Sequence, residues 1–173
     1  MQRRRAKTKV PMGQSKVAKG QRSSIRPVGF ASGIHPKLPI EVVERTDLLR
    51  RMGPRHFAPP QRPAFDLFLL VRSGRGRHVV DFVETPLKPA RLVRVRSGQV
   101  QIWDTESDFE ATLIVSSIRS RPRFAQRVSS NTYRDLDPDS LKTAQDLVKI
   151  LTREQERFAG DDSSIELMST IFE

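Results

Sequence analysis

The distribution of apolar and polar positions divides the chain into three segments with different periodicities. Residues 65–116 hold short runs of large apolar side chains separated by glycine, proline or serine, which is typical of strands joined by turns. From Leu141 to Phe158 the apolar residues recur every three or four positions, which is typical of an amphipathic helix. Residues 1–38 show neither period. The pattern therefore predicts strands followed by helices and preceded by a tail.

Five or six strands are expected within residues 65–116. RLVRVR (91–96) alternates, with Val93 and Val95 on one face of a half-buried strand and arginines on the other. The other runs are FDLFLLV (65–71), RHVVDFV (77–83), VQIW (100–103) and FEATLIVSS (109–117). SGRG at 73–76 is expected to close a hairpin between the first two of these runs, and residues 85–89 are expected to turn. Several strands without helices between them predict an antiparallel sandwich or barrel.

The segments on either side of this region predict shorter elements and two helices. PIEVV (39–43) is expected to be extended, and TDLLRRM (46–52) to form a helical turn with Thr46 or Asp47 as N-cap. Three prolines in RHFAPPQRPAF (55–65) exclude a helix there. Asp137 is the expected N-cap of the first long helix, which Gly160 terminates. The second begins near Asp162 and is still apolar at its end, so segment 132–173 is expected to be truncated.

The net charge of +11 belongs to the tail. Residues 1–38 hold ten Lys or Arg and no acidic residue, whereas the rest of the chain holds 21 basic and 20 acidic residues. Repulsion between like charges and few apolar side chains predict that the tail is disordered. It could bind nucleic-acid phosphates non-specifically, or simply act as a solubilising or upstream extension. The candidate nucleic-acid contacts are Arg3, Arg4, Arg5, Lys7 and Lys9.

The sequence shows no pattern that predicts an enzyme or a cofactor. It has no cysteine, and His35, His56 and His78 are too far apart for an HxH or HxxxH metal motif. There is no GxSxG nucleophile elbow. The glycines of SGRGRH (73–78) stand between two strands, whereas a phosphate-binding loop stands between a strand and a helix. No cofactor and no metal are therefore expected.

No apolar run is long enough to predict a membrane span. A spanning helix needs about 18 or more consecutive apolar residues, and the basic N-terminus lacks the apolar core of a signal peptide. We therefore expect a cytoplasmic protein without a membrane partner.

The strand region, FDLFLLVRSGRGRHVVDFVETPLKPARLVRVRSGQVQIW (65–103), resembles the N-terminal, cupin-like sensing domain of AraC-type transcriptional regulators. The likeness is closest in SGRGRH…DF, LKP and SGQVQ, and LTREQERFAG (151–160) with the helix after it resembles the interdomain helices of these regulators. The resemblance implies a mainly β fold with C-terminal helices. A cupin-like jelly-roll β-barrel (39–131) would be followed by an α-helical pair (132–173).

The chain also departs from the family pattern. Ala90 follows Pro89, and Ser97 precedes Gly98, where the family tends to have Pro-Gly. Asp66 replaces a common histidine, and Arg94 an apolar residue. The family's DNA-binding domain, two helix-turn-helix units, is missing from this sequence. The helices in 138–172 do not replace it, because the second carries acidic residues and no basic ones.

The resemblance implies a small-molecule effector inside the barrel, a homodimer formed by the helices, and DNA binding through the missing domain. Every candidate residue also fits an ordinary core. The alternatives are a stand-alone cupin-fold protein whose basic arm binds nucleic acid, and a cupin enzyme, which the histidine spacing disfavours. The candidate ligand-binding residues are Leu67, Leu69, His78, Val80, Phe82, Val95 and Trp103. The candidate dimerisation residues, about half expected to pack internally, are Leu141, Leu147, Val148, Leu151, Ile165, Met168 and Phe172.

Overall fold

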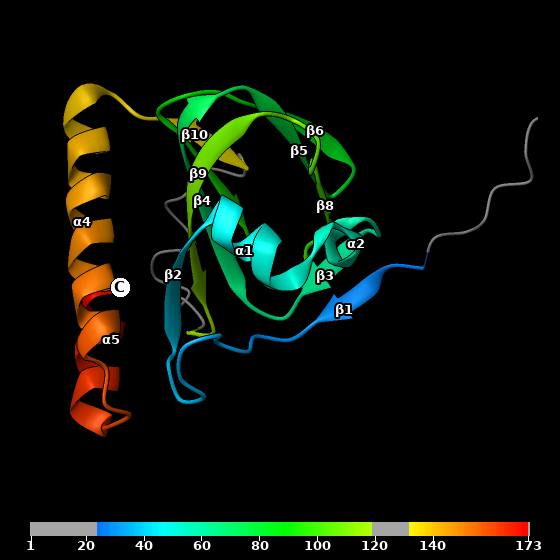
Figure 1. Ribbon diagram of the computed structural model, residues 1–173. Helices are drawn as coiled ribbons and strands as arrows, with labels where there is room; N and C mark the ends of the chain where they lie inside the picture. The colour runs from blue at the N-terminus through cyan, green and yellow to red at the C-terminus, as the bar shows by residue number, and fades with distance from the viewer. Residues whose placement is uncertain (1–23, 119–131, 173) are drawn as a thin grey trace, which may run out of the picture.

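Two five-stranded sheets face each other in the computed structural model, which describes residues 24–118 and 132–172 (Figure 1). The first sheet has the order β1 (Arg26–Val28), β3 (Gln61–Pro63), β8 (Gln101–Trp103), β5 (Gly76–Val80) and β6 (Val83–Leu87). The second has the order β10 (Tyr133–Asp135), β7 (Arg91–Val95), β4 (Asp66–Gly74), β9 (Phe109–Ser116) and β2 (Ile40–Glu44). The expected fold class, mainly β with C-terminal helices, is confirmed. The sheets form a jelly-roll-like sandwich and do not close into a barrel.

Apolar side chains from both sheets fill most of the space between them. The alternation predicted for β7 is confirmed, since Val93 and Val95 are at most 1% exposed. The first sheet and β9 add Val80, Leu87, Trp103 and Phe109 to this core. Apolar side chains thus occupy much of the space between the sheets of the described residues.

The predicted hairpin between residues 65–71 and 77–83 is wrong. β4 pairs with β7 and β9, whereas β5 pairs with β6 and β8, so the chain changes sheets at Arg75. Gly74 has a φ of +77°, and a Cβ at this position would collide with the backbone of Asp108. Glycine is required because the two strands approach so closely. The prediction that this loop bends the chain agrees with this geometry.

The turn expected at residues 85–89 is also misplaced, because Thr85 lies within β6. The β5–β6 hairpin turns at Asp81 and Phe82, whose φ angles are +47° and +68°. A two-residue hairpin favours positive φ at both turn positions, and the usual Asn-Gly signal is absent here.

The helices α1 (Arg45–Met52) and α2 (Pro54–Phe57) cover one edge of the sandwich (Figure 1). α1 starts one residue before the predicted turn and has no side-chain N-cap, so the prediction of Thr46 or Asp47 as N-cap is wrong. Buried Arg45 anchors α1 by donating to the carbonyl oxygens of Asp104, Ser107 and Phe109. α2 corrects the exclusion of helix after residue 54, because Pro54 occupies the first turn, where proline is tolerated.

Both boundaries of the predicted sheet domain need correction. Residues 24–38 were expected to belong to a disordered tail, but β1 pairs in parallel with β3, and Leu38 is 1% exposed. At the other end, β10 pairs with β7, so residues 133–135 belong to the second sheet and not to the helical segment. The candidate nucleic-acid contacts Arg3, Arg4, Arg5, Lys7 and Lys9 lie outside the described residues.

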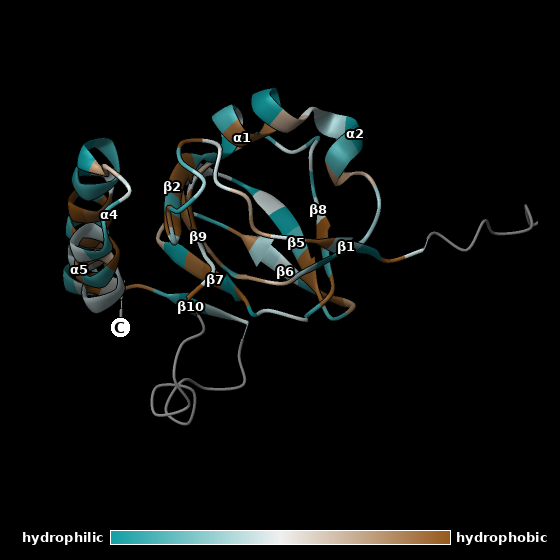
Figure 2. Cartoon of the chain, turned by 90° about the horizontal axis from the view of Figure 1, so that it is seen from below, coloured by the Kyte–Doolittle hydropathy of each residue, from teal (hydrophilic) through white to brown (hydrophobic). Residues whose placement is uncertain are grey.

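The helices α4 (Pro138–Arg157) and α5 (Asp162–Phe172) form a layer on the outer side of the second sheet (Figure 2). Asp137 is the N-cap that the sequence predicts, and its carboxylate accepts from the backbone N–H of Ser140 at 2.8 Å. α4 ends at Arg157 with Phe158 as its C-cap, so the prediction that Gly160 terminates the helix is wrong; Gly160, with a φ of +84°, lies in the turn before α5. A second core, between this layer and β2, consists of Leu38, Ile40, Val42, Leu151 and Met168.

Candidate functional site

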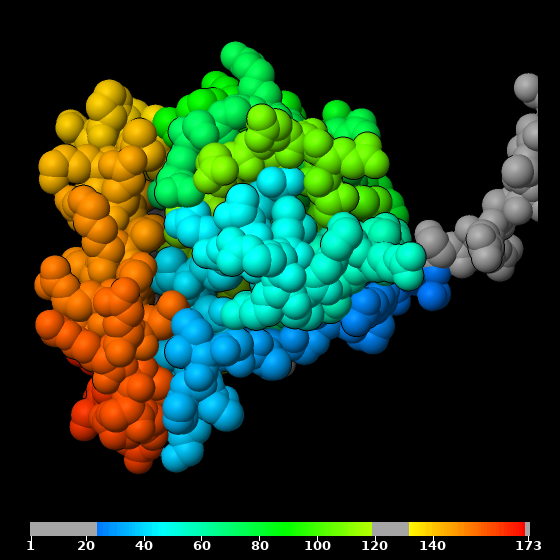
Figure 3. Space-filling model, viewed as in Figure 1, coloured from blue at the N-terminus to red at the C-terminus, as the bar shows by residue number. Residues whose placement is uncertain are grey.

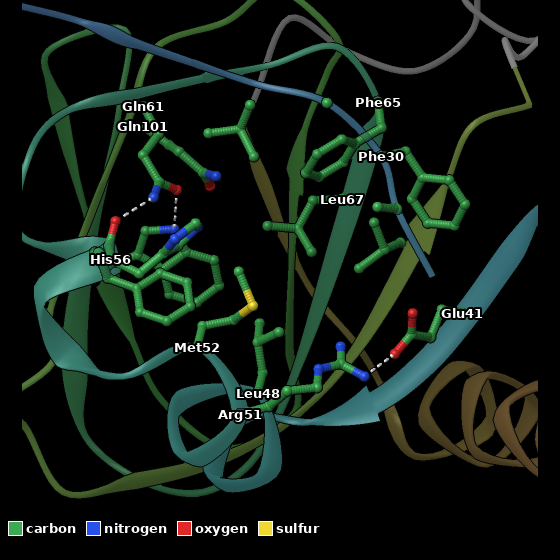
Figure 4. Close-up of a pocket in the computed structure, with 16 residues that line it drawn as sticks. Phe30, Glu41, Leu48, Arg51, Met52, His56, Gln61, Phe65, Leu67 and Gln101 are labelled. Carbon is green, nitrogen blue, oxygen red and sulfur yellow. Dashed lines mark hydrogen bonds and ion pairs between the residues drawn. The ribbon is translucent and has the colours of Figure 1, made fainter. Parts of the chain in front are cut away.

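A cavity of about 90 Å³ lies between α1, α2, residues 28–31 and the inner faces of the two sheets (Figure 4). Its wall is mainly apolar. The apolar side chains in this wall include Leu48, Met52, Phe57, Phe65, Leu67 and Trp103. The cavity therefore offers an apolar volume at the margin of the sandwich, closed on one side by the chain segment that leads from β1 to β2.

The volume of this cavity limits what can enter it. A cavity of about 150 Å³ holds benzene, and drug-sized ligands occupy about 300–1,000 Å³. At about 90 Å³ the cavity accommodates a molecule of only a few non-hydrogen atoms. A larger ligand would have to displace residues 28–31 or α1.

Buried polar side chains of the first sheet form one end of the cavity. The indole Nε1 of Trp103 donates to Gln61 Oε1 at 3.1 Å, and Gln61 Nε2 donates to the carbonyl of His56 at 2.8 Å. Gln101 stands opposite Gln61 across the β3–β8 pair. Its Oε1 lies 3.1 Å from the Nε2 of His78. Both glutamines and His78 are 2% exposed, so these hydrogen bonds are shielded from solvent.

His78 fixes the orientation of Gln101. Burial lowers the pKa of His78 to about 4, although the hydrogen bond with Gln101 and the charge of Asp104 oppose this shift. The imidazole is therefore neutral near pH 7. With its Nε2–H donating to Gln101 Oε1, the amide nitrogen of Gln101 is left to face elsewhere.

An ion pair forms the opposite end of the cavity (Figure 4). Glu41 Oε1 lies 2.7 Å from Arg51 Nη1, and Glu41 Oε2 accepts from the backbone N–H of Gly33 at 2.9 Å. The Glu41 side chain is 3% exposed and that of Arg51 36%, so the pair lies at the mouth with the carboxylate inside. The charge of the buried carboxylate is thus already balanced.

His56 lines the cavity as well, next to Phe57. Burial, and then the positive charge of Arg26, lower the pKa of its imidazole. The imidazole of His56, which borders the cavity, is therefore neutral near pH 7.

The strand that carries Glu41 also holds the outer helix. The side-chain amide of Gln155 accepts from the Val42 N–H at 2.6 Å and donates to the Val42 carbonyl at 3.0 Å. β2 is the edge strand of its sheet, so the amide of Gln155 takes the place of a further strand. One short strand thus joins the cavity wall to α4.

The predicted ligand-binding residues are only partly brought together. Leu67 and Trp103 line the cavity, and His78 reaches it only through Gln101. Phe82 is 73% exposed at the hairpin turn, so the prediction that it faces inward is wrong. The turn at Asp81 and Phe82 interrupts the alternation of inward and outward side chains along β5, so Phe82 does not follow Val80 to the inner face. The remaining candidates, each 1% exposed in the core, are Leu69, Val80 and Val95.

Sequence reasoning missed the polar residues of the cavity. Glu41, Arg51, Gln61 and Gln101 come from β2, α1, β3 and β8, and no spacing in the sequence connects them. A signal did exist at VQIW (100–103), where glutamine occupies an inward position of a predicted strand. Buried glutamine needs a partner, but the partner follows from the strand pairing and not from the sequence.

The predicted dimerisation residues differ in their exposure. Leu151 and Met168 are 2% and 0% exposed in the second core, so their assignment to a dimer interface is wrong. Val148 packs partly against that core, whereas Leu147 is 42% exposed. Leu141 and Ile165 are half-buried, and the side chain of Phe172 lies outside the described part of the chain. Two exposed residues that the prediction missed are Ile150 and Leu167, at 42% and 47%.

Two departures from the family pattern compensate each other. Asp66 and Arg94 form an ion pair at 2.7 Å across the β4–β7 pair, and their side chains are 9% and 14% exposed. The guanidinium of Arg94 also lies 5.1 Å from the ring centroid of Phe68. Ala90, in place of a glycine, has a φ of +61°, so the corner keeps the conformation for which glycine is suited.

Within residues 24–118 and 132–172, no group of three or more His, Asp or Glu side chains is placed to hold a metal ion. None of the helices in these ranges is long and apolar enough to cross a membrane.

Comparison with known proteins gives weak structural likenesses only. No family model and no curated protein matches the sequence. Similar solved structures include apo ToxT from Vibrio cholerae strain SCE256 (TM-score 0.36, 8% identity, 62% of this chain and 44% of that chain). ToxT from the same strain with an unsaturated fatty acid bound has a TM-score of 0.34 and 10% identity, over 61% of this chain and 44% of that chain.

A cupin 2 conserved barrel domain protein from Salinispora arenicola CNS-205 has a TM-score of 0.30 and 14% identity, over 53% of this chain and 75% of that chain. The match spans less than half the length of the two ToxT structures. Likeness of this degree assigns no function to the chain.

Proposed function

We propose that this chain is the effector-sensing domain of an AraC-type transcriptional regulator, with the cavity beside Trp103 as the effector site. The observation that carries the proposal is an apolar cavity with hydrogen-bonding groups at one end and an ion pair at the other. Small-molecule sites typically combine an apolar wall with a few placed polar groups. The resemblance of residues 65–103 to the family's sensing domain supports the same assignment.

Two connections would transmit occupancy of the cavity to α4. Glu41 lines the cavity, and the next residue, Val42, holds the amide of Gln155. The segment before β2 forms the second connection, which runs over the surface to the helical layer (Figure 3). Its Gly33 donates to Glu41, and its His35 ring packs edge-on against Phe158 at 5.2 Å. A ligand that displaces Glu41 or this segment would therefore shift α4.

Such a shift regulates only if the ligand prefers one arrangement of α4 over another. Coupling free energies between sites are commonly about 1–3 kcal/mol. Loss of the two hydrogen bonds between Gln155 and Val42 lies within that range, since each is worth about 1 kcal/mol. The contacts present are thus of the right strength to be broken or kept by a small effector.

The output of the domain is a homodimer whose arrangement depends on α4. Leu147 and Ile150 lie three positions apart on α4, which places them on neighbouring parts of one helix face, and each is 42% exposed. A second copy of the chain would cover this face. DNA would be bound by a helix-turn-helix domain that is not part of this sequence.

The effector site is tested by screening small metabolites for a rise in the thermal unfolding midpoint of the full chain. Leu48→Phe would fill the cavity from α1, and Leu167→Phe adds the same volume at an exposed position of α5. A genuine effector stabilises wild type and Leu167→Phe but not Leu48→Phe. Equal stabilisation of all three proteins would rule out the cavity as its site.

The dimer is tested by equilibrium sedimentation of three variants. Leu147→Glu and Ile150→Glu should be folded monomers, because each charge replaces an exposed apolar side chain. Leu151→Glu should unfold, since Leu151 is 2% exposed. A wild-type chain that stays monomeric at every concentration would refute the homodimer.

A second function is favoured by the charge of the N-terminal segment, where ten cationic residues and no acidic one precede residue 39. This segment would bind nucleic acid non-specifically through phosphate contacts. A gel shift of the full chain against residues 24–173, at two salt concentrations, tests this. The truncation keeps every residue that the structure describes, β1 included. Binding should require residues 1–23 and weaken steeply with salt, and equal binding by both proteins would refute this function.

A further inference from the structure

We infer that the cavity selects a small uncharged molecule with an apolar body and one oxygen acceptor of the carbonyl type, which takes its hydrogen bond from Gln101 Nε2. This inference rests on the proposed effector site and adds the chemical class of the ligand. It is carried by the hydrogen bonds at the Gln61–Gln101 end of the cavity, in which the side-chain nitrogen of Gln101 takes no part.

The polar atoms at this end can be followed one by one. Gln61 uses both ends of its amide, one with Trp103 and one with the carbonyl of His56. The indole N–H is used in the same contact, and Gln101 Oε1 is used by His78. For Gln101 Nε2, no partner is found among residues 24–118 and 132–172. Since Gln101 lines the cavity and is 2% exposed, its side-chain N–H groups are available to a water or a ligand in the cavity.

The unused group is a donor, and this sets the chemistry of the ligand. An N–H needs an acceptor, so a ketone, ester or amide oxygen completes the network. A ligand group that can only donate cannot use the Gln101 N–H groups and would leave them without a partner, which costs binding energy.

The charges near the cavity disfavour an ion. The only carboxylate in its wall, that of Glu41, is paired with Arg51 and lies at the opposite end (Figure 4). The groups around Gln101 are an indole, an amide and the buried ring of His78, none of which carries a charge near pH 7. A carboxylate or an ammonium placed there would be desolvated without a counter-charge.

The wall and the volume set the rest of the ligand. Leu67 and Met52 give the cavity apolar surface between Gln101 and the Glu41–Arg51 pair (Figure 4), and Phe57 also lines it. Because the volume is about 90 Å³, the body of the ligand is limited to a few carbons unless the wall moves. Butan-2-one has the apolar body and the single carbonyl oxygen, and because it is about as large as benzene it enters only when the wall moves. It serves as a probe.

The test uses the full chain and three probes of similar size: butan-2-one, butan-2-ylammonium and butyrate. The chain has one tryptophan, so the indole N–H cross-peak of Trp103 in a ¹H–¹⁵N spectrum reports on the cavity without ambiguity. We expect butan-2-one to shift this peak and to bind at least tenfold more tightly than either ion. The side-chain amide peaks of Gln101 should move downfield with the same midpoint.

Gln101→Met removes the donor at nearly constant length, and Gln145→Met makes the same change at an exposed position of α4. Butan-2-one should bind Gln101→Met at least tenfold more weakly, whereas xenon, which needs no hydrogen bond, should bind both variants and wild type alike. If Gln101→Met does not fold, the shift of the Gln101 side-chain amide peaks in wild type still shows whether this amide contacts the ketone.

Three outcomes would overturn the inference. The first two are equal binding of the ketone and either ion, and unchanged ketone binding in a folded Gln101→Met. The third is amide peaks of Gln101 that stay fixed while Trp103 shifts. If neither butan-2-one nor xenon shifts the Trp103 peak, the cavity admits no ligand, and the proposed effector site falls together with the inference.

Discussion

The inner faces of the two sheets differ in chemistry. The second sheet contributes an apolar face, on which Leu67, Leu69, Val93, Val95 and Leu113 are each at most 1% exposed. The first sheet buries Gln61, His78 and Gln101 as deeply, at 2% exposure, beside Trp103. One face therefore gains stability by excluding water, whereas the other depends on satisfied hydrogen bonds.

This difference separates stability from recognition. An apolar face offers a ligand no unused hydrogen-bonding group, because its side chains interact only through van der Waals contacts. A polar network can leave one group over, and here that group is the amide nitrogen of Gln101. The second sheet thus supplies the scaffold and, through its edge strand β2, the contact with α4, while the first sheet supplies the selectivity of the cavity.

The largest expected effect lies on the apolar face. Leu113→Ala should lower the free energy of unfolding by about 4 kcal/mol, because Leu113 is fully buried and its truncation leaves a cavity. Urea denaturation of the variant measures this loss. Gln101→Met on the polar face should lose less than half as much. Equal losses in the free energy of unfolding would show that the two faces contribute to stability to the same extent.

The polar face should respond to pH where the apolar face does not. The pKa of His78 is about 4 in the folded chain and about 6.5 when unfolded, so the unfolded chain binds the extra proton first as the pH falls. Stability should therefore decrease between pH 6.5 and 4, by up to about 3 kcal/mol relative to the same interval in His78→Gln. Urea titrations at several pH values measure the difference. Parallel pH profiles for both proteins would contradict a buried, neutral His78.

The contact between the second sheet and the helical layer should be of intermediate strength. Gln155→Ala removes two buried hydrogen bonds to Val42 and should cost about 2 kcal/mol. Hydrogen exchange at the Val42 amide should accelerate in this variant and remain unchanged in Gln145→Ala. A Val42 amide that exchanges at the same rate in both would show that Gln155 does not hold α4 on β2.

The smallest effect is expected at the corner that joins the two sheets. Ala90 lies between β6 and β7 with a φ of +61°, a conformation that disfavours any residue with a Cβ. Ala90→Gly should raise the free energy of unfolding by about 1 kcal/mol, which a thermal unfolding series against wild type would detect. A loss of stability would mean that the corner is not strained.

Much of the fold could be predicted from periodicity, but the pairing of its strands could not. Residues 91–96 alternate because one face is buried, and Asp137 caps a helix because its side chain reaches the N–H of Ser140. The change of sheet at Gly74 escaped prediction, since a four-residue loop with two glycines (73–76) between two apolar runs suits a hairpin equally well. Leu147 and Leu151 likewise share a helical period, and only the position of β2 shows which of them is covered.

The candidate site was predictable in part for the same reason. Leu67 and Trp103 follow from the inward positions of single strands. Gln101 matters because it lies opposite Gln61 and next to His78, and both relations arise from pairing between strands distant in the sequence. Phe82 was misassigned because two residues with positive φ turn its side chain outward.

The central claim is that occupancy of the cavity is sensed by α4 through β2. A single ¹H–¹⁵N titration of the full chain with butan-2-one tests it, by following the indole peak of Trp103 together with the side-chain amide peaks of Gln155. We predict that both sets of peaks shift and share one saturation midpoint. A Trp103 peak that saturates while the Gln155 peaks stay in place would contradict the claim.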